Sequence, residues 1–363
     1  MEKREKNRKI KRMEVKENEI GNDRNSFGYS TNGCSDDGGS KTMGIQTKAD
    51  VKFSLIEKTL LNPNNLLSIT ELCEIAGVSR SGFYRWQKAK PIREQREEED
   101  KADFDLILEA YKFRNYPKGA RLIHMRLLHK NVLMNLKKIR RLMHKYNLIC
   151  PIRRANPYKQ MAREMRTNTV SSNEVNREFL LHGARKILLT DITYIPYRGG
   201  KYCYLSTILD AFTREILSYR ISESLEVTFV LETVEMLMSE YGAELDDETI
   251  VHSDQGCHYT SKAFIKALKD ADLIQSMSEK GCCWDNAPQE SFFGHMKDEV
   301  SEGISKCERF EQVKYIIDDW MDYYNNDRYQ WDLLKLSPRE YYQYTQTGIY
   351  PLMKWGSAPN PEV

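Results

Sequence analysis

The sequence predicts an α/β protein in which a mixed five-stranded sheet flanked by helices follows all-α modules. Two patterns support this prediction. Before about residue 147, apolar residues recur at the three- and four-residue spacing of helices. From about Arg185, short apolar runs with strand character and helical segments follow one another in the order β-β-β-α-β-α-β-α. In sheets with helices on both faces, functional side chains gather outside the carboxyl ends of the strands.

The N-terminal segment, residues 1–60, is predicted to be disordered. It begins with a mixed-charge run and passes into a stretch rich in Asn, Gly, Ser and Asp around Asn32–Ser40. Such a composition buries too little apolar surface to offset the entropy that folding costs.

Residues 61–92 have the pattern of a helix-turn-helix. Ser68 and Glu71 have the spacing of a capping box at the start of the first helix. Gly77 suits the turn, and Ser79 can cap the second helix. Three residues of the second helix are predicted to contact DNA: Arg80, Ser81 and Arg85. A short helical hairpin without DNA contact would explain the same pattern.

A basic helical block is predicted at 102–150, and a polar connector at 151–182. Between Lys112 and Arg166 the sequence has sixteen Lys and Arg residues and one acidic residue, Glu164. Charge of a single sign indicates a nucleic-acid-binding surface, whereas a solvated helical face is the ordinary alternative. The helical pattern leaves five cations available on the outside: Lys137, Lys138, Arg140, Arg141 and Lys145. The first four are predicted to contact the DNA backbone.

The α/β part is predicted at 183–303, followed by a C-terminal helix and tail at 304–363. The two glycines of Arg198-Gly-Gly-Lys201 favour a tight turn between the first two strands. The predicted strands are 186–197, 201–212, 215–221, 248–253 and 273–278. The predicted helices of this part are 224–241, 261–271 and 286–302.

Three carboxylates have contexts that suit a divalent-metal site. Asp191 lies inside an apolar strand, where a carboxylate is costly unless it is paired or binds a metal. Asp254 directly follows a strand, and Glu290 lies in the first turn of a helix. Their hard oxygen ligands favour Mg²⁺, with Mn²⁺ as a substitute, over zinc. Two such ions can hold a phosphodiester for in-line displacement.

Further residues near these carboxylates have competing interpretations. Lys297 lies seven residues after Glu290, about 10 Å along the same helix face, and is predicted to contact a substrate phosphate. His252 and His258 flank Asp254, where they could assist catalysis or form structural hydrogen bonds.

Asp210 is a rival for the role of first carboxylate. It lies in Thr207-Ile-Leu-Asp-Ala-Phe-Thr-Arg214, and we interpret it as a turn former that pairs with Arg214.

Composition argues against a membrane or secreted protein. Hydrophobic residues make up 40% of the chain, and no apolar run reaches the length of about 18 residues that suggests a membrane span. The N-terminus lacks the apolar stretch of a signal peptide. The eight cysteines form no CxxC pair and are interpreted as reduced thiols of a cytoplasmic protein.

Four segments carry a resemblance to a known family: Thr190-Asp-Ile-Thr-Tyr194, Leu209-Asp-Ala-Phe-Thr-Arg214, His252-Ser-Asp-Gln-Gly256 and Asp285-Asn-Ala-Pro-Gln-Glu290. They resemble the DDE transposases of bacterial insertion sequences. More narrowly, they resemble the retroviral-integrase-like family whose catalytic subunit is encoded by the second reading frame. Tyr323-Tyr-Asn325, Arg328 and Leu336-Ser-Pro338 match that family's C-terminal pattern. The resemblance covers roughly residues 66–345.

The resemblance implies a ribonuclease-H-like core with Asp191, Asp254 and Glu290 as metal ligands and catalytic residues. It implies Mg²⁺-dependent cleavage of DNA strands and transfer of 3′-hydroxyl groups at the ends of an insertion sequence. The expected partners are double-stranded DNA of the terminal repeats and the target, further copies of the chain, and a first-frame partner subunit. Such a protein is expected in the cytoplasm, associated with the nucleoid. The alternatives are a non-catalytic DNA-binding regulator derived from a transposase, and a nuclease that only hydrolyses DNA.

Overall fold

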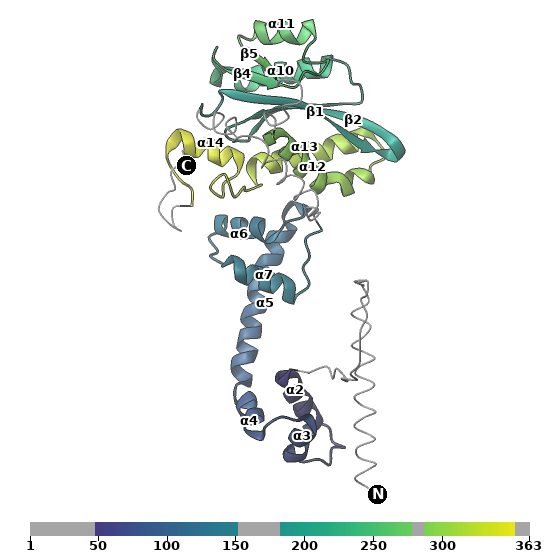
Figure 1. Cartoon of the computed structure of the whole chain (residues 1–363), viewed down its shortest axis with the longest axis vertical. Helices are drawn as coiled ribbons and strands as arrows, with labels where there is room; N and C mark the ends of the chain where they lie inside the picture. Colours follow the sequence, from purple (N-terminus) through teal and green to yellow (C-terminus); the bar gives the residue numbers. More distant parts are fainter. Residues whose placement is uncertain (1–47, 152–181, 278–286, 353–363) are drawn as a thin grey trace, which may run out of the picture. The chain divides into compact units, whose positions relative to one another are not determined.

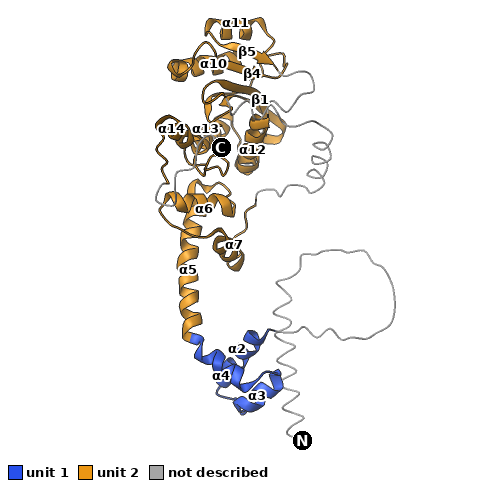
Figure 2. Cartoon of the chain, turned by 60° about the vertical axis from the view of Figure 1, so that its left-hand side comes forward, with its two compact units in different colours: residues 1–90 blue, residues 91–363 orange. Residues whose placement is uncertain are grey.

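The structure, a computed structural model, describes residues 48–151, 182–277 and 287–352. The chain divides into two units, residues 1–90 and 91–363, which Figure 2 colours separately. None of the helices in the described ranges combines the length and the apolar character needed to cross a membrane.

The described part of the first unit consists of helices α2 (Ala49–Leu60), α3 (Ile69–Ala76) and α4 (Arg80–Lys88). The predicted capping box forms at the start of α3, where the backbone N–H of Ser68 donates to Glu71 Oε2 at 2.9 Å. Gly77 ends α3 with φ 64°, a left-handed conformation that glycine adopts without strain. The predicted pair of helices joined by a tight turn therefore forms.

Helix α2 corrects the prediction of disorder for residues 1–60. Phe53 and Ile56 are three residues apart on one face of α2, and both are buried. They pack against Leu72, Cys73 and Phe83 of the other two helices. Composition averaged over 60 residues hid this short amphipathic stretch, whose stability comes from packing. Residues 1–47 lie outside the described part of the chain.

The second unit begins with three helices: α5 (Lys90–Lys112), α6 (Ala120–His129) and α7 (Leu136–Lys145). Helix α5 includes residues 93–100, because Pro91 is tolerated in a first turn and the following Arg, Glu and Gln residues are good helix formers. The three helices share an apolar core that contains Ile107, Ala110, Ile123, Leu127, Met134, Ile139, Leu142 and Met143.

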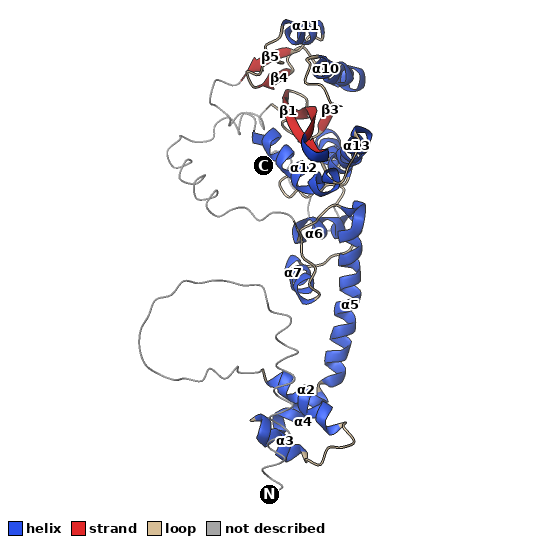
Figure 3. Ribbon diagram, turned by 90° about the vertical axis from the view of Figure 1, so that its right-hand side faces the viewer, coloured by secondary structure: helices blue, strands red, loops and turns tan. Residues whose placement is uncertain are grey.

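The sheet has five strands in the spatial order β3-β2-β1-β4-β5. The strands are β1 (Ile187–Tyr197), β2 (Lys201–Asp210), β3 (Ile216–Ser222), β4 (Ile250–Ser253) and β5 (Ile274–Met277). Strands β1, β2 and β3 pair antiparallel, whereas β4 pairs parallel with both β1 and β5. Figure 3 shows the strands in red. The predicted mixed five-stranded sheet is confirmed.

Helices cover both faces of this sheet (Figure 1). They are α10 (Thr228–Tyr241), α11 (Lys262–Asp270), α12 (Ala287–Ser305) and α13 (Phe310–Asn326). Leu189 of β1 points into a core shared with α12 and α13, whereas Leu188 points into a core shared with α10 and α11. This alternation follows from the two-residue period of a strand. The predicted ribonuclease-H-like class, a mixed sheet with helices on both faces after N-terminal helices, is confirmed.

The predicted C-terminal helix and tail contain two helices, α13 and α14 (Pro338–Thr347). Ser337 and Glu340 form a capping box at the start of α14. The side-chain amide of Asn325 exchanges two hydrogen bonds with the backbone of Ile216, at 3.0 and 2.8 Å, and so fastens the end of α13 to β3. The C-terminal sequence pattern therefore has structural roles within this fold.

Candidate active site

Asp191 and Asp254 lie level with each other on neighbouring strands. In the parallel pairing of β1 with β4, Leu189 is the partner of His252. Continued by two residues, this register aligns Asp191 with Asp254, the first residue after β4. Neighbouring strands are about 4.8 Å apart. The two residues therefore lie near each other at the carboxyl end of β4, where the sequence pattern predicted a site.

Glu290 reaches the same end of the sheet from α12. The preceding residue, Gln289, is fully buried, and its side-chain amide donates a hydrogen bond to the Thr207 hydroxyl. Thr207 is the cross-strand partner of Asp191 in β2. This contact anchors the first turn of α12 beside Asp191, while Glu290 itself is exposed. Lys297 is also exposed, two turns further along the helix.

The electrostatics of Asp191 show that these groups interact. Its half-buried position raises the pKa of the Asp191 carboxyl to about 6, and the charges of Asp254 and Glu290 add to this shift. The backbone N–H of Ile192, which donates to Asp191 Oδ1 at 2.7 Å, and the Lys297 ammonium group oppose it. Partial desolvation lowers the pKa of Lys297, and Asp191 opposes that change.

The donor set fits a hard divalent cation. All three groups offer carboxylate oxygens, the ligands that Mg²⁺ and Mn²⁺ prefer. Like charges raise the pKa of Asp191, and a bound cation would remove this repulsion. Within the residues that the structure describes, no three His, Cys, Asp or Glu side chains converge closely enough to share one ion. The three carboxylates therefore influence one another electrostatically, but they do not converge on a single point.

Gly256 has a role at this site that sequence reasoning missed. Its backbone N–H donates to Asp254 Oδ1 at 2.9 Å and orients that carboxylate. A Cβ atom at residue 256 would lie 2.8 Å from the same oxygen, closer than real contacts allow. Tyr259 was also missed: it is buried, and its hydroxyl accepts a hydrogen bond from Thr190, next to Asp191, at 3.5 Å. The glycine two residues after Asp254, in the segment His252-Ser-Asp-Gln-Gly256, was the sequence signal from which this role could have been predicted.

Asp210, the rival carboxylate, has a structural role. It is fully buried, and it accepts a hydrogen bond from the Phe212 N–H at 3.0 Å, so the turn-forming interpretation is confirmed. The predicted pairing with Arg214 is wrong, because Asp210 pairs with Arg185 at 3.1 Å. The antiparallel pairing of Leu188 with Asp210 brings Arg185, two residues before β1, to the end of β2.

The two histidines near Asp254 form structural hydrogen bonds. The Nδ1 atom of His252 lies 3.0 Å from the hydroxyl of Ser276 in β5. The Nε2 atom of His258 lies 2.7 Å from the carbonyl oxygen of Leu225. Of the two interpretations, these contacts favour structural hydrogen bonding.

The candidate DNA-binding residues of α4 are at its surface. Arg80, Ser81 and Arg85 are exposed, and Phe83 between them is buried. Arg80 donates a long hydrogen bond of 3.4 Å to the hydroxyl of Thr70 in α3. The face of α4 that faces solvent therefore matches the face expected to contact DNA.

The expectation that the five outer cations of α7 are all available is wrong, and Lys145 is among those paired with acids. Lys138 pairs with Asp103, and both terminal nitrogens of Arg141 bind the carboxylate of Asp100, at 2.7 and 2.8 Å. These acids belong to α5, outside the sequence window in which the positive charge was counted. Lys137 and Arg140 remain exposed, and neither has an ion-pair partner among the described residues.

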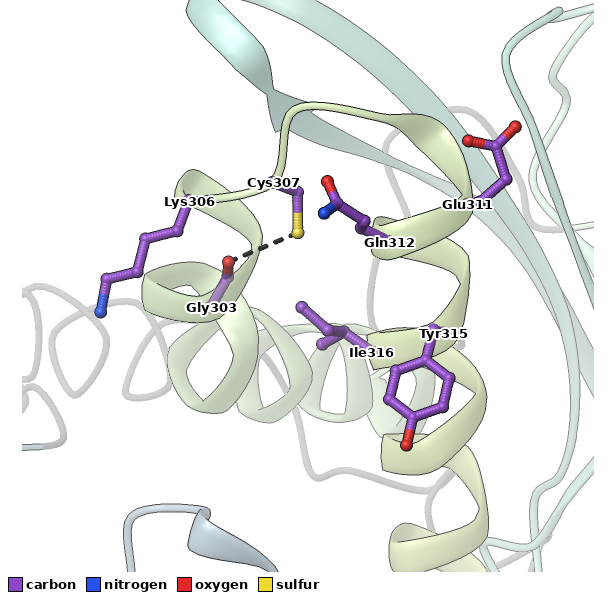
Figure 4. Close-up of a pocket in the computed structure, with 7 residues that line it drawn as sticks. All are labelled: Gly303, Lys306, Cys307, Glu311, Gln312, Tyr315 and Ile316. Atoms are coloured by element: carbon purple, nitrogen blue, oxygen red, sulfur yellow. Dashed lines mark hydrogen bonds between the residues drawn. The ribbon is translucent and has the colours of Figure 1, made fainter.

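A shallow pocket of about 390 Å³ lies away from the carboxylates, between the end of α12 and the start of α13 (Figure 4). Gly303 and Ile316 line it, and Cys307 donates a hydrogen bond to the Gly303 carbonyl at 3.5 Å. Gly303 is thirteen residues after Glu290, about 20 Å along α12. This pocket is therefore separate from the carboxylate site.

Three family models match the chain. Residues 182–283 and 290–345 each match a model described as an integrase core domain. Residues 97–156 match an HTH-like domain. The HTH-like match thus includes α6, α7 and most of α5, and does not include α3 and α4.

Two relatives of similar sequence are named as a transposase or a transposase-like protein, which agrees with these family models. An uncharacterized transposase-like protein of Haemophilus influenzae is 33% identical over 59% of this chain and 95% of its own length. The transposase for insertion sequence element IS629 of Shigella sonnei is 29% identical over 71% of this chain and 85% of its own length. Among solved structures, the catalytic core domain of BIV integrase is 13% identical with a TM-score of 0.36, covering 47% of this chain and 99% of that one.

Proposed function

Because the chain belongs to the integrase-core transposases of insertion sequences, we propose that it cuts DNA strands at the ends of such an element and transfers the resulting 3′-hydroxyl groups to new phosphodiesters. The main support for the proposal is that three carboxylates lie at one end of the sheet and influence one another electrostatically. Burial raises the pKa of Asp191, and the charges of Asp254 and Glu290 add to the shift, a perturbation that is common at functional sites.

In this proposal Asp191, Asp254 and Glu290 are the catalytic carboxylates and would hold Mg²⁺, with Mn²⁺ as a substitute. A divalent cation held there lowers the pKa of a bound water or hydroxyl group and offsets the charge on a leaving oxygen. The remaining residues orient these ligands. The Gly256 N–H fixes the rotation of the Asp254 carboxylate, and Gln289 keeps the first turn of α12 against β2.

The proposed DNA contacts are Arg80, Ser81 and Arg85 of α4, Lys137 and Arg140 of α7, and Lys297 of α12. Lys297 would meet a phosphate near the scissile bond, because it shares a helix face with Glu290. Lys138 and Arg141 join these contacts only where DNA displaces Asp103 and Asp100 from them.

The proposed partners follow from this chemistry. They are double-stranded DNA of the terminal repeats and of the target, further copies of the chain, and a first-frame partner subunit. The proposed domain division assigns 61–92 to a helix-turn-helix, 102–150 to a basic helical domain and 183–303 to the catalytic core.

The decisive experiment incubates the purified chain with labelled element-end DNA and Mg²⁺, and measures both nicked and joined products. Asp191→Asn, Asp254→Asn and Glu290→Gln should each abolish both products while DNA binding and thermal stability stay near those of the unaltered chain. Asp298→Asn makes the same charge change at an exposed position of α12 and is the matched control, with expected normal activity.

Two outcomes would contradict the proposal. Nicked products without joined products would indicate a nuclease that only hydrolyses. DNA binding without either product, in a chain whose carboxylates are intact, would indicate a DNA-binding regulator.

A further inference from the structure

Trp331 is held outward by a rigid turn between α13 and α14. The turn is closed by a hydrogen bond from Gln330 N–H to the Leu336 carbonyl at 2.9 Å. The side chains of Leu333 and Leu336 are buried beneath it. Leu334 and Lys335 have φ values of 55° and 68°, a left-handed backbone that costs non-glycine residues energy. Despite this tight anchoring, 42% of the Trp331 surface is exposed.

Helix α6 lies along the segment that contains this turn. Arg126 lies 3.6 Å from Asp327, and the ring of His129 stacks on Tyr329 with 3.6 Å between ring centroids. Nearer the start of α6, Arg121 and His124 both reach Trp331, the His124 ring with its centroid 6.2 Å from that of the indole. The side chains of Arg126 and His129 are buried or half-buried, whereas those of Arg121 and Trp331 are exposed to solvent. The interface therefore ends in an exposed aromatic ring.

Two cations that have no acidic partner among the described residues lie over this ring and leave part of it exposed. The Arg121 guanidinium group lies 5.7 Å, and the Lys335 ammonium group 5.4 Å, from the centroid of the indole. Among the described residues, neither cation has a carboxylate within ion-pair distance. The neighbouring acid, Asp332, lies 3.8 Å from Arg214 instead. This differs from α7, where three cations are neutralised by acids of α5.

An aromatic face beside uncompensated cations is the combination that binds single nucleotides of DNA. The base stacks on the ring, and the cations attract the adjacent phosphates. A purely structural cation–aromatic contact would tie α6 to the turn, but it needs only one cation and no exposed ring surface. The planar indole also favours a base over an acidic peptide, whose carboxylates would use the cations alone.

We propose that Trp331, Arg121 and Lys335 form a binding site for an unpaired nucleotide of DNA, with the base stacked on the indole and the flanking phosphates on the two cations. The site rests on the proposed function and extends it, because cutting and joining strands produces ends at which bases unpair. An unpaired base costs little to present to the protein. The helical block that carries α6 and the core that carries Trp331 then hold the same nucleotide.

The test uses the full chain and two short duplexes of the same sequence. One is fully paired, and the other has a single unpaired 2-aminopurine. The unaltered chain should quench the 2-aminopurine fluorescence, because the base stacks on Trp331. Trp331→Ala should abolish quenching and weaken binding to this probe about 5- to 100-fold, the range for loss of one base–aromatic stack, with little effect on the paired duplex. Trp331→Phe should keep most of both signals.

Two further variants separate stacking from charge. Tyr315→Ala removes another exposed aromatic side chain, on α13, and should leave quenching unchanged. Arg121→Gln combined with Lys335→Gln should lower the slope of log affinity against log salt by up to about 2 on the unpaired probe. If Trp331→Ala lowers the thermal unfolding midpoint, Trp331→Phe decides the question, since it keeps the ring in place.

Equal loss of affinity for both duplexes in the Trp331→Ala variant, or unchanged quenching, would overturn the proposal. These outcomes are distinct from failure of the proposed function. An unaltered chain that quenches the probe but neither cuts nor joins DNA would refute the transposase activity and support the site. A chain that cuts and joins DNA, with a Trp331→Ala variant that binds the probe normally, would refute the site alone.

Discussion

The buried ion pair between Glu299 and Arg328 gives a prediction with a defined magnitude. Glu299 lies on α12, nine residues after Glu290, and its carboxylate accepts hydrogen bonds from Arg328 at 2.9 and 3.1 Å. It also accepts one from the Trp320 indole N–H at 3.0 Å. Both charged side chains are almost fully buried. The pair therefore fastens α12 to α13 and to the segment after it.

Glu299→Gln keeps the shape of the side chain and an acceptor for Trp320, but it leaves the Arg328 charge buried without a partner. Removing one member of a buried pair costs about 3–5 kcal/mol. For a unit of this size, each kcal/mol corresponds to about 2–4 °C, so the unfolding midpoint should fall by ~6–20 °C. Thermal unfolding followed by circular dichroism measures this change. Glu302→Gln, at an exposed position of α12 paired with Lys306, should leave the unfolding midpoint nearly unchanged.

A double-mutant cycle tests the cause of the loss. Glu299→Leu combined with Arg328→Met removes both charges, and the double variant should be more stable than the sum of its single changes predicts. The reasoning fails if Glu299→Gln lowers stability by less than about 1 kcal/mol. It also fails if the two single changes add, because the charges would then act independently.

Three further predictions concern the site and its surroundings. Gly256→Ala should displace the Asp254 carboxylate and slow strand cleavage by as much as about 10²-fold at saturating DNA, with a normal unfolding midpoint; an unchanged rate would contradict the role of Gly256. Lys297→Ala should weaken binding of element-end DNA more than it lowers stability, and normal end binding with normal joining would return Lys297 to an ordinary surface role. Lys137→Gln with Arg140→Gln should reduce the salt slope of duplex binding by up to about 2, and a parental slope would place the DNA path elsewhere.

Local patterns in the sequence were enough to predict most elements of the fold. The β1–β2 turn followed from two glycines, and the strand bounds agree within about two residues because alternation and turn residues act locally. The start of α12 was predicted from Pro288 and the residues around it. The α2 helix was missed because its two buried side chains have no local signal strong enough to override a polar composition.

The proximity of Asp191 to Asp254 depends on strand register, which the sequence does not contain. Their strand contexts and the resemblance to a known family indicated both residues, and the pairing of Leu189 with His252 supplied the geometry. The errors came from interactions distant in sequence. Arg185 reaches Asp210, 25 residues away, and Asp100 reaches Arg141, 41 residues away. The charge count covered only residues 112–166, so it could not include acidic partners that folding brings from other segments.

The ion pairs between α5 and α7 make the affinity of α7 for other anions depend on α5. A phosphate that binds Arg141 must displace Asp100, which holds it through two hydrogen bonds. The exchange replaces one anion by another, so it releases fewer counterions than a free cation would. If α7 binds DNA as proposed, substitution of an acid in α5 would strengthen that binding without altering any residue of α7. The affinity of α7 for an anion can thus be changed, in evolution or by design, through substitutions in a neighbouring helix.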